Sequence, residues 1–361
     1  MAVTIYRSTD AGAPAFPASG AQNGAGYIMD VMKACLVDGY GSKPGAGWTL
    51  DYEDTTAGKR RTGISNGNGV IEFVTWGSYS LGLFIWDSIT TPGVGRIRDD
   101  AFSAVMSDGV NGWKHEGAPA PGDESDEIAG LYCYGFRSGE ESNIAWTVYA
   151  DDKAAWLLSH YPEGHSNTEP GDSINSAKSN YYPQLFMGAL KSDDLQRGGA
   201  GNFFLGYGGI GTSATSGNAT SGNQGNMTYF FGLRTPVDTA PAVANSPQYE
   251  PAGFECNHYL RNPLSSARLL LPVLVSYEGA DAPKPASLSS SYADYQFAVL
   301  PGVAQIGEHN SQTFFWVGYN ENRGAPWSLQ PATIGGITWM PWSIGAVNLQ
   351  ECGITDNADW W

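Results

Sequence analysis

The chain has 361 residues and a mass of 38.5 kDa, enough for one large domain or two of ordinary size. Glycine and proline contribute 47 and 21 residues, but 12 Trp, 19 Tyr and 14 Phe leave ample core material, which excludes a collagen-like or globally disordered chain. Acidic residues outnumber basic ones by 36 to 19. Because phosphate backbones and anionic lipid surfaces would repel such a chain, we expect neither nucleic acid nor a membrane as a partner.

The first regular element that the sequence predicts is a helix over residues 27–37. Apolar residues recur there at the helical spacing i, i+3, i+4, i+7; they are Ile28, Val31, Met32, Cys35 and Leu36. Gly39 follows them, and a glycine at this place can adopt the left-handed conformation that closes a helix. Residues 8–26 are mostly Gly, Ala, Pro and Ser, so we expect an extended arm before the helix. No basic region followed by an apolar run precedes it, and we expect no secretory signal.

Beyond residue 48 the sequence changes to short β-branched and aromatic runs separated by Gly, Asn, Asp and Pro, a pattern typical of all-β proteins. We expect strands over 69–76, 79–86, 130–136, 143–150, 154–159, 202–207, 227–233, 269–277, 296–301, 313–319 and 337–341. The short Asp-rich link within residues 148–157 predicts a hairpin. The expected fold is mainly β, an antiparallel sandwich-like body with one N-terminal amphipathic helix and long Gly/Ser/Asn-rich loops.

Composition divides the chain into three segments. These are an N-terminal arm and helix (1–50), a β-rich first half (51–165) and a β-rich second half (166–361). The second half contains a low-complexity insertion at 211–226, where Ala-Thr-Ser-Gly-Asn occurs twice. No break between segments is strong, so one continuous domain stays an alternative.

Two short motifs resemble catalytic signatures but stand in the wrong context. Residues 206–211 fit G-x-G-x-x-G, yet they lead into the polar insertion instead of the helix that would bind a pyrophosphate. Residues 63–67 fit G-x-S-x-G, yet they lead into a strand, whereas a nucleophile elbow leads into a helix. We interpret the second motif as a turn and expect no nucleotide cofactor.

No pattern predicts a metal site. The four cysteines are isolated, which indicates free thiols in a reducing compartment; they are Cys35, Cys133, Cys256 and Cys352. His160 and His165 are close, but the proline and glycine between them exclude a helical metal site. A loop site that includes Glu163 and a calcium site in the acidic loop 123–127 stay open as alternatives, with a solvated loop favoured.

Three N-terminal stretches together carry a family resemblance. They read VTIYRSTDAGAP (3–14), ACLVDGYGSKP (34–44) and GWT (47–49). This combination resembles a family of tailed-bacteriophage virion structural proteins. Residues 146–152, WTVYADD, are similar to the mid-chain hairpin of that family, and residues 270–275 and 300–303 are similar to parts of its C-terminal half.

The resemblance implies a structural subunit of the virion, placed first in the tail or tail tip, and no catalytic residue. We therefore expect the protein not to be an enzyme and not to bind a cofactor. The implied partners are copies of itself and other virion proteins, and the implied location is the virion, assembled in the host cytoplasm. A head decoration or fibre protein is one alternative.

An alternative of a different class is a receptor-binding protein that binds or degrades a host surface glycan. It would need a groove floored by Trp or Tyr and, if catalytic, two carboxyl groups about 5 to 10 Å apart.

Four residues are candidates for subunit interfaces, because each is a large apolar group near a chain end that a monomer would struggle to bury. They are Ile5, Tyr6, Trp360 and Trp361. Residues 3–6 could also add as a strand to a neighbouring sheet edge, with the connector 11–26 supplying the reach. Deleting residues 2–20 is therefore expected to leave a folded chain that does not assemble.

Overall fold

The computed structural model describes residues 2–16, 24–55, 60–76, 80–86, 88–92, 94–96, 131–134, 145–160, 183–191, 202–209, 229–232, 253–257, 269–278, 295–307, 331–343 and 351–361. Within these residues the fold is mainly β, with antiparallel sheets and one short α-helix, as the sequence predicts. The insertion 211–226, the acidic loop 123–127 and the expected strand 313–319 lie outside the described residues.

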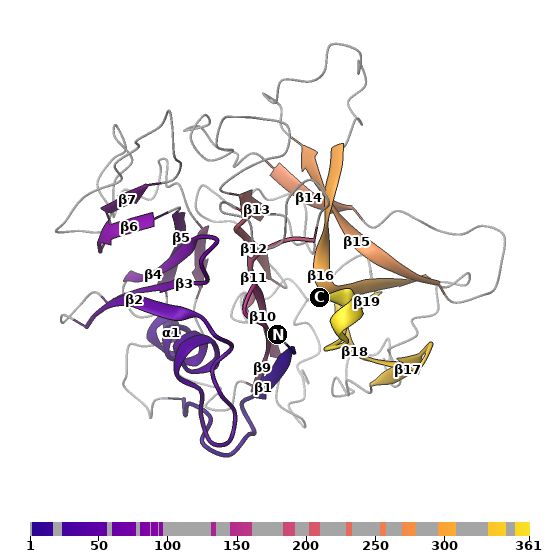
Figure 1. Ribbon diagram of the computed structural model, residues 1–361, viewed down its shortest axis with the longest axis horizontal. Helices are drawn as coiled ribbons and strands as arrows, with labels where there is room; N and C mark the ends of the chain where they lie inside the picture. The colour runs from indigo at the N-terminus through magenta and orange to yellow at the C-terminus, as the bar shows by residue number, and fades with distance from the viewer. Residues whose placement is uncertain are drawn as a thin grey trace, which may run out of the picture.

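The strands of the described residues form three large sheets and a two-stranded ribbon, and all of their pairings are antiparallel (Figure 1). The first sheet has the order β2 (Thr49–Asp54), β3 (Arg61–Ser65), β4 (Val70–Trp76), β5 (Ser80–Trp86), β8 (Leu131–Tyr134). The central sheet has the order β1 (Thr4–Arg7), β9 (Ala145–Ala150), β10 (Ala154–His160), β11 (Pro183–Gly188), β12 (Phe204–Gly209), β13 (Tyr229–Gly232). The C-terminal sheet has the order β14 (Gly253–Asn257), β15 (Leu269–Glu278), β16 (Tyr295–Gly307), β19 (Glu351–Ile354), β18 (Ile337–Ser343), β17 (Ala332–Ile334). The ribbon pairs β6 (Ser88–Thr91) with β7 (Val94–Arg96).

Each predicted strand that falls among the described residues coincides with an observed strand, and the hairpin at 148–157 is β9 and β10. The pattern missed strands that are short or that contain Gly, Pro or acidic residues; these are β2, β3, β6, β7, β11, β14, β17 and β19. Such residues lower the intrinsic tendency to form a strand, so these segments depend on pairing with a neighbour.

The predicted helix is α1 (Gly24–Lys33), which continues as a π-helical turn over Ala34–Asp38. It begins inside the segment expected to be an extended arm. Gly39 closes it, with φ 74° and ψ 171°, so this residue has positive φ but is not in the left-handed helical conformation that we expected. Its N–H donates to the Ala34 carbonyl at 2.8 Å, which ends the π turn.

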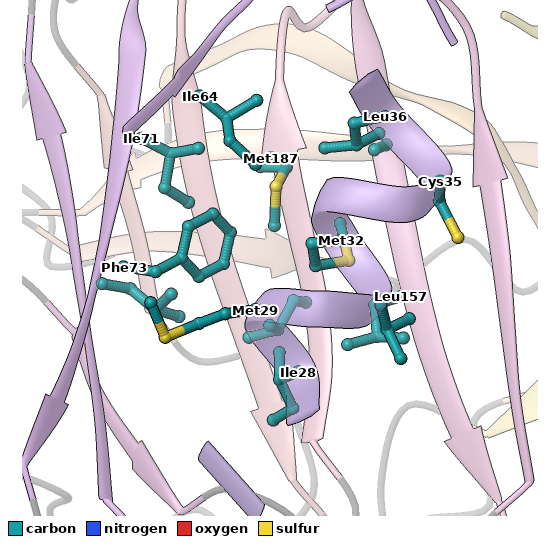
Figure 2. Packing of buried hydrophobic residues seen from close by; sticks show 14 of the residues in the cluster. Ile28, Met29, Met32, Cys35, Leu36, Ile64, Ile71, Phe73, Leu157 and Met187 are labelled. Atoms are coloured by element: carbon teal, nitrogen blue, oxygen red, sulfur yellow. The ribbon is translucent and has the colours of Figure 1, made fainter. Parts of the chain in front are cut away.

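The helix fills the space between the first sheet and the central sheet. Figure 2 shows Met32 of the helix among side chains of both sheets: Ile64 and Ile71 come from the first sheet, and Leu157 and Met187 come from the central sheet. All of these side chains are fully buried. The predicted helical periodicity is confirmed, because its core members are also fully buried; they are Ile28, Val31, Met32 and Leu36. We refer to this cluster as the first core.

The central sheet is buried on both faces. On β10, Leu157 belongs to the first core, whereas its neighbour Trp156 belongs to a second core that also contains Leu300 and Ile354 of the C-terminal sheet. Successive side chains of a strand point to opposite faces. A strand buried on both faces therefore reads as an unbroken apolar run, as Ala154–Leu158 does.

The predicted segments do not correspond to separate sheets. The central sheet combines β1 from segment 1–50 with β9 and β10 from segment 51–165 and β11 to β13 from segment 166–361. In Figure 1 this sheet lies between the other two. In the described parts of the chain, no helix has the length and apolar character needed to span a membrane.

Candidate functional site

The stretches that carry the family resemblance meet at one place in the structure. Strand β1 pairs with β9, and Ser8 extends the pairing, because its N–H donates to the Trp146 carbonyl at 3.0 Å. The Tyr6 hydroxyl donates to the Pro44 carbonyl at 2.7 Å. The Trp48 indole N–H donates to the Asp151 carbonyl at 2.9 Å in a buried position. We name this assembly of residues 4–14, 34–49 and 146–151 the N-terminal junction.

At the outer side of the junction, three polar side chains surround the backbone of β1. The Lys43 ammonium donates to Asp10 Oδ2 and to the Ile5 carbonyl, both at 2.5 Å. The Arg7 N–H donates to Asp10 Oδ2 at 2.6 Å and to the Tyr40 hydroxyl oxygen at 3.1 Å. The Tyr40 hydroxyl donates to Asp10 Oδ2 at 3.1 Å and to the Arg7 carbonyl at 3.2 Å, the two acceptors sharing its one proton. Asp10, Tyr40 and Lys43 thus form one connected network with the strand.

A tight turn places Tyr40 and Lys43 together. Each donates its N–H to the carbonyl of the other at 2.9 Å. Gly41 inside this turn has φ +58°, and a Cβ atom there would collide with the Ala11 carbonyl. A glycine is therefore required at this position both for its backbone conformation and for the close approach of the Asp10–Ala11 segment.

The electrostatics of the junction favour a charged Asp10 among neutral neighbours. Partial burial raises the pKa of the Asp10 carboxyl, but the hydrogen bonds from Lys43, the Arg7 N–H and Tyr40 outweigh it, and the net pKa is lowered. Burial raises the pKa of Tyr6 to about 12 and that of the Tyr40 hydroxyl further. Burial also raises the pKa of the Cys35 thiol well above its usual range. At neutral pH the phenols and the thiol stay protonated, so they serve packing and hydrogen bonding.

Aromatic rings connect the network to the first core. The Tyr40 ring lies 5.8 Å from the Tyr6 ring and 6.3 Å, edge to face, from the Trp146 ring. The Trp146 indole N–H donates to the Tyr27 hydroxyl on α1 at 2.8 Å. The junction therefore joins the N-terminal strand, the helix and the mid-chain hairpin into one packed unit.

The four predicted interface residues fall into two groups. Tyr6 is 0% exposed in the first core, and Trp361 is 5% exposed in the second core, so the chain itself buries both rings. These two residues were selected because a monomer was expected to struggle to bury them. That reason does not hold. Ile5 and Trp360 are only partly buried and pack against the second core. A role of any of the four in subunit contacts stays a prediction.

The predicted strand addition also takes a different form. Residues 4–7 add to a sheet edge, but that edge belongs to β9 of the same chain. Because Tyr6 is part of the first core, deleting residues 2–20 would remove core packing as well as any assembly contact. The deletion therefore cannot separate folding from assembly.

The rejected motifs lie in β structure where they are described. Residues 206–209 belong to β12, and residues 63–65 belong to β3, where Ser65 donates to Asp51 Oδ1 at 2.9 Å. The interpretation of the whole motif 63–67 as a turn is wrong, because residues 63–65 are paired in β3 and only its last two residues belong to the connection from β3 to β4. The described residues contain no group of three or more His, Cys, Asp or Glu that could hold a metal ion. His165 and Glu163 lie outside them.

Asp10, Tyr40 and Lys43 were not singled out from the sequence, although all three lie in the stretches that carry the resemblance. Their place in these stretches was the only signal in the sequence, because their roles depend on contacts between residues about 30 positions apart. Comparison of the chain with protein-family models and with curated proteins gives no match. A functional proposal rests on the geometry of the junction and on the resemblance.

Proposed function

We propose that the protein is a non-enzymatic structural subunit of a tailed-bacteriophage virion, in the tail or tail tip, which works through contacts with copies of itself and other virion proteins. The observation that supports this most is the convergence of residues 3–14, 34–44, 47–49 and 146–152 in the N-terminal junction. Side chains of these stretches bond to the main chain of one another, as Tyr6 does to Pro44 and Trp48 does to Asp151. A motif of this kind serves architecture, which agrees with a structural family.

The two cores give such a subunit a rigid frame with both described ends attached. Strand β1 pairs in the central sheet, and Trp361 packs in the second core with its indole N–H donating to the Thr355 carbonyl at 2.6 Å. Partly buried apolar side chains from both ends and from β18 pack against the second core; they are Val3, Ile5, Met340 and Trp360. We name these four residues the apolar rim, and we propose that it contributes to a subunit contact, since subunit interfaces concentrate apolar and aromatic groups.

The test is the assembly state of the purified chain. Light scattering after size-exclusion chromatography, over a wide concentration range, should show a symmetric oligomer, and negative-stain microscopy should show rings or tubes. The double variant Ile5→Ser/Trp360→Ser should keep the fold by circular dichroism but lose the oligomer. The control is Leu50→Ser, which changes a partly buried apolar residue of the first core instead.

A stable monomer at all concentrations would contradict the proposal. The same preparation should be incubated with host surface polysaccharide, and product release followed by chromatography of the sugars. A monomer that binds or cleaves the polysaccharide would support the receptor-binding class instead. Binding of the chain to purified capsids, and not to tails, would place it among head decoration proteins.

A further inference from the structure

Among the described strands, β1 forms one edge of the central sheet, so one side of its backbone faces away from β9. The hydrogen bond from the Ser8 N–H to the Trp146 carbonyl sets the alternation, because every second residue bonds to the partner strand. Thr4 and Tyr6 therefore point their backbone groups at β9, and Ile5 and Arg7 point theirs outward. An outward row of N–H and C=O groups is a template on which another chain can add a strand.

Most of the outward backbone groups of β1 already have hydrogen-bond partners. The Arg7 N–H donates to Asp10 and Tyr40, and the Arg7 carbonyl accepts from the Asp10 N–H at 3.0 Å and from the Tyr40 hydroxyl at 3.2 Å. The Ile5 carbonyl accepts from the Lys43 ammonium at 2.5 Å. Three of the four outward groups of these two residues thus have partners supplied by Asp10, Tyr40 and Lys43.

We infer that Asp10, Tyr40 and Lys43 form an edge cap, which keeps β1 from accepting a strand of a second copy of the chain. An incoming strand would have to displace hydrogen bonds to a carboxylate and from an ammonium, and such charge-assisted bonds are stronger than the neutral backbone bonds that would replace them. Because the cap occupies backbone groups of β1, it blocks strand addition independently of which proteins the chain assembles with. It also directs ordered assembly to other surfaces, such as the apolar rim.

The test removes the cap while keeping the shape of its side chains. The triple variant Asp10→Asn/Tyr40→Phe/Lys43→Met leaves the net charge unchanged. Circular dichroism and cooperative thermal unfolding should show that it folds. Hydrogen exchange followed by mass spectrometry should show the Arg7 amide exchanging at least about tenfold faster than in the wild type, because its acceptors are weakened or lost. Sedimentation velocity should show species larger than the wild-type assembly, growing with concentration.

The matched control is Lys33→Met/Glu53→Gln, which removes another ion pair, 2.6 Å long, with the same change of charges. This control should sediment like the wild type. A folded triple variant with wild-type sedimentation and wild-type exchange at Arg7 would overturn the edge cap. If the triple variant does not fold, Tyr40→Phe alone, which removes the hydroxyl from both Arg7 groups, is measured by the same two methods and judged by the same outcomes.

Different results would contradict the edge cap and the proposed function, on which the edge cap does not depend. The oligomeric state of the wild type tests the proposed function, whereas the difference between the wild type and the uncapped variant tests the cap. A monomeric wild type with an associating variant would retain the cap and discard the structural role.

Discussion

The indole ring of Trp361 lies against the backbone of Gly302, so that a Cβ atom on Gly302 would be 2.5 Å from Cε2 and Nε1 of the ring. The same segment is held by the Thr355 N–H, which donates to the Gly302 carbonyl at 2.9 Å. Trp361 thus closes the second core over a site that only a glycine leaves open.

This contact predicts that Gly302→Ala destabilises the protein more than backbone strain alone would. Gly302 has φ +78°. Gly336 has φ +80°, and a Cβ atom on it would meet nothing within 4 Å, so Gly336→Ala is a matched control. Both variants should lose about 1 kcal/mol to the positive φ. Gly302→Ala should lose about 2 kcal/mol or more beyond this, because Trp361 must leave its place in the second core. Urea unfolding measures the difference, and equal losses would show that the Trp361 contact contributes nothing.

The second prediction concerns a buried ion pair in the first sheet. Glu72 is 0% and Arg61 7% exposed at the side chain, with Arg61 Nη1 3.7 Å from Glu72 Oε1. The Trp86 indole N–H donates to the other oxygen of Glu72 at 3.1 Å. Glu72→Gln should cost about 3 kcal/mol of unfolding free energy, because it removes the carboxylate charge that faces a buried guanidinium.

The control for that pair is Glu53→Gln. Glu53 contacts Lys33 at 2.6 Å and Arg60 at 2.9 Å, but its side chain is 22% exposed. Because water screens such pairs, this variant should cost about 1 kcal/mol or less. Similar losses in the two variants, measured by urea unfolding, would contradict the importance of burial.

The third prediction tests the link between the N-terminal junction and the hairpin. Trp48→Phe keeps an aromatic ring but removes the indole N–H that donates to the Asp151 carbonyl. The loss should be about 1 to 2 kcal/mol, since a buried hydrogen bond is broken. Trp360→Phe is the comparison, because no hydrogen bond of the Trp360 indole N–H occurs among the described residues. Thermal unfolding should show the larger decrease in melting temperature for Trp48→Phe. A larger decrease for Trp360→Phe would show that the Trp48–Asp151 hydrogen bond does not stabilise the junction.

The fourth prediction concerns pH. The pKa of Asp10 is lowered in the folded state, so its carboxylate contributes stability above the unfolded pKa near 3.8, and this contribution disappears as the pH falls below that value. The wild type should therefore exceed Asp10→Asn in melting temperature at about pH 6, and the difference should shrink towards about pH 3. Calorimetry over this range measures it. A difference in melting temperature that does not change with pH would show that the Asp10 charge does not stabilise the folded state.

Local features of this protein could be predicted from its sequence. The helix followed from the spacing of Ile28, Met32 and Leu36, because a helical period concerns residues within one or two turns. The β9–β10 hairpin followed from its Asp-rich link, where Asp151 Oδ1 accepts from the N–H groups of Lys153 and Ala154, both at 2.8 Å. These interactions join residues two or three positions apart, so the local sequence contains all the participants.

The candidate site needed more than local sequence. The stretches that carry the resemblance contain Asp10, Tyr40 and Lys43, but the proposed edge cap depends on Lys43 reaching the Ile5 carbonyl 38 positions away. The interface prediction for Tyr6 and Trp361 was based on their place near the chain ends. The sequence did not indicate that the Tyr6 hydroxyl would donate to the Pro44 carbonyl. Nor did it indicate that the Trp361 ring would pack against Gly302 on β16.

What the sequence by itself determined is the class of the fold: it is mainly β with one N-terminal helix, the strands rich in β-branched and aromatic residues lie where the pattern places them, and large apolar side chains must be buried somewhere. Only the tertiary structure decided what buries them. The two-sided burial of the central sheet depends on contacts such as the bond from the Trp156 indole N–H to the Pro301 carbonyl, 145 residues away. The reason is physical: the hydrophobic effect drives apolar surface out of water without specifying a partner, and the partner follows from how all the sheets and the helix pack together.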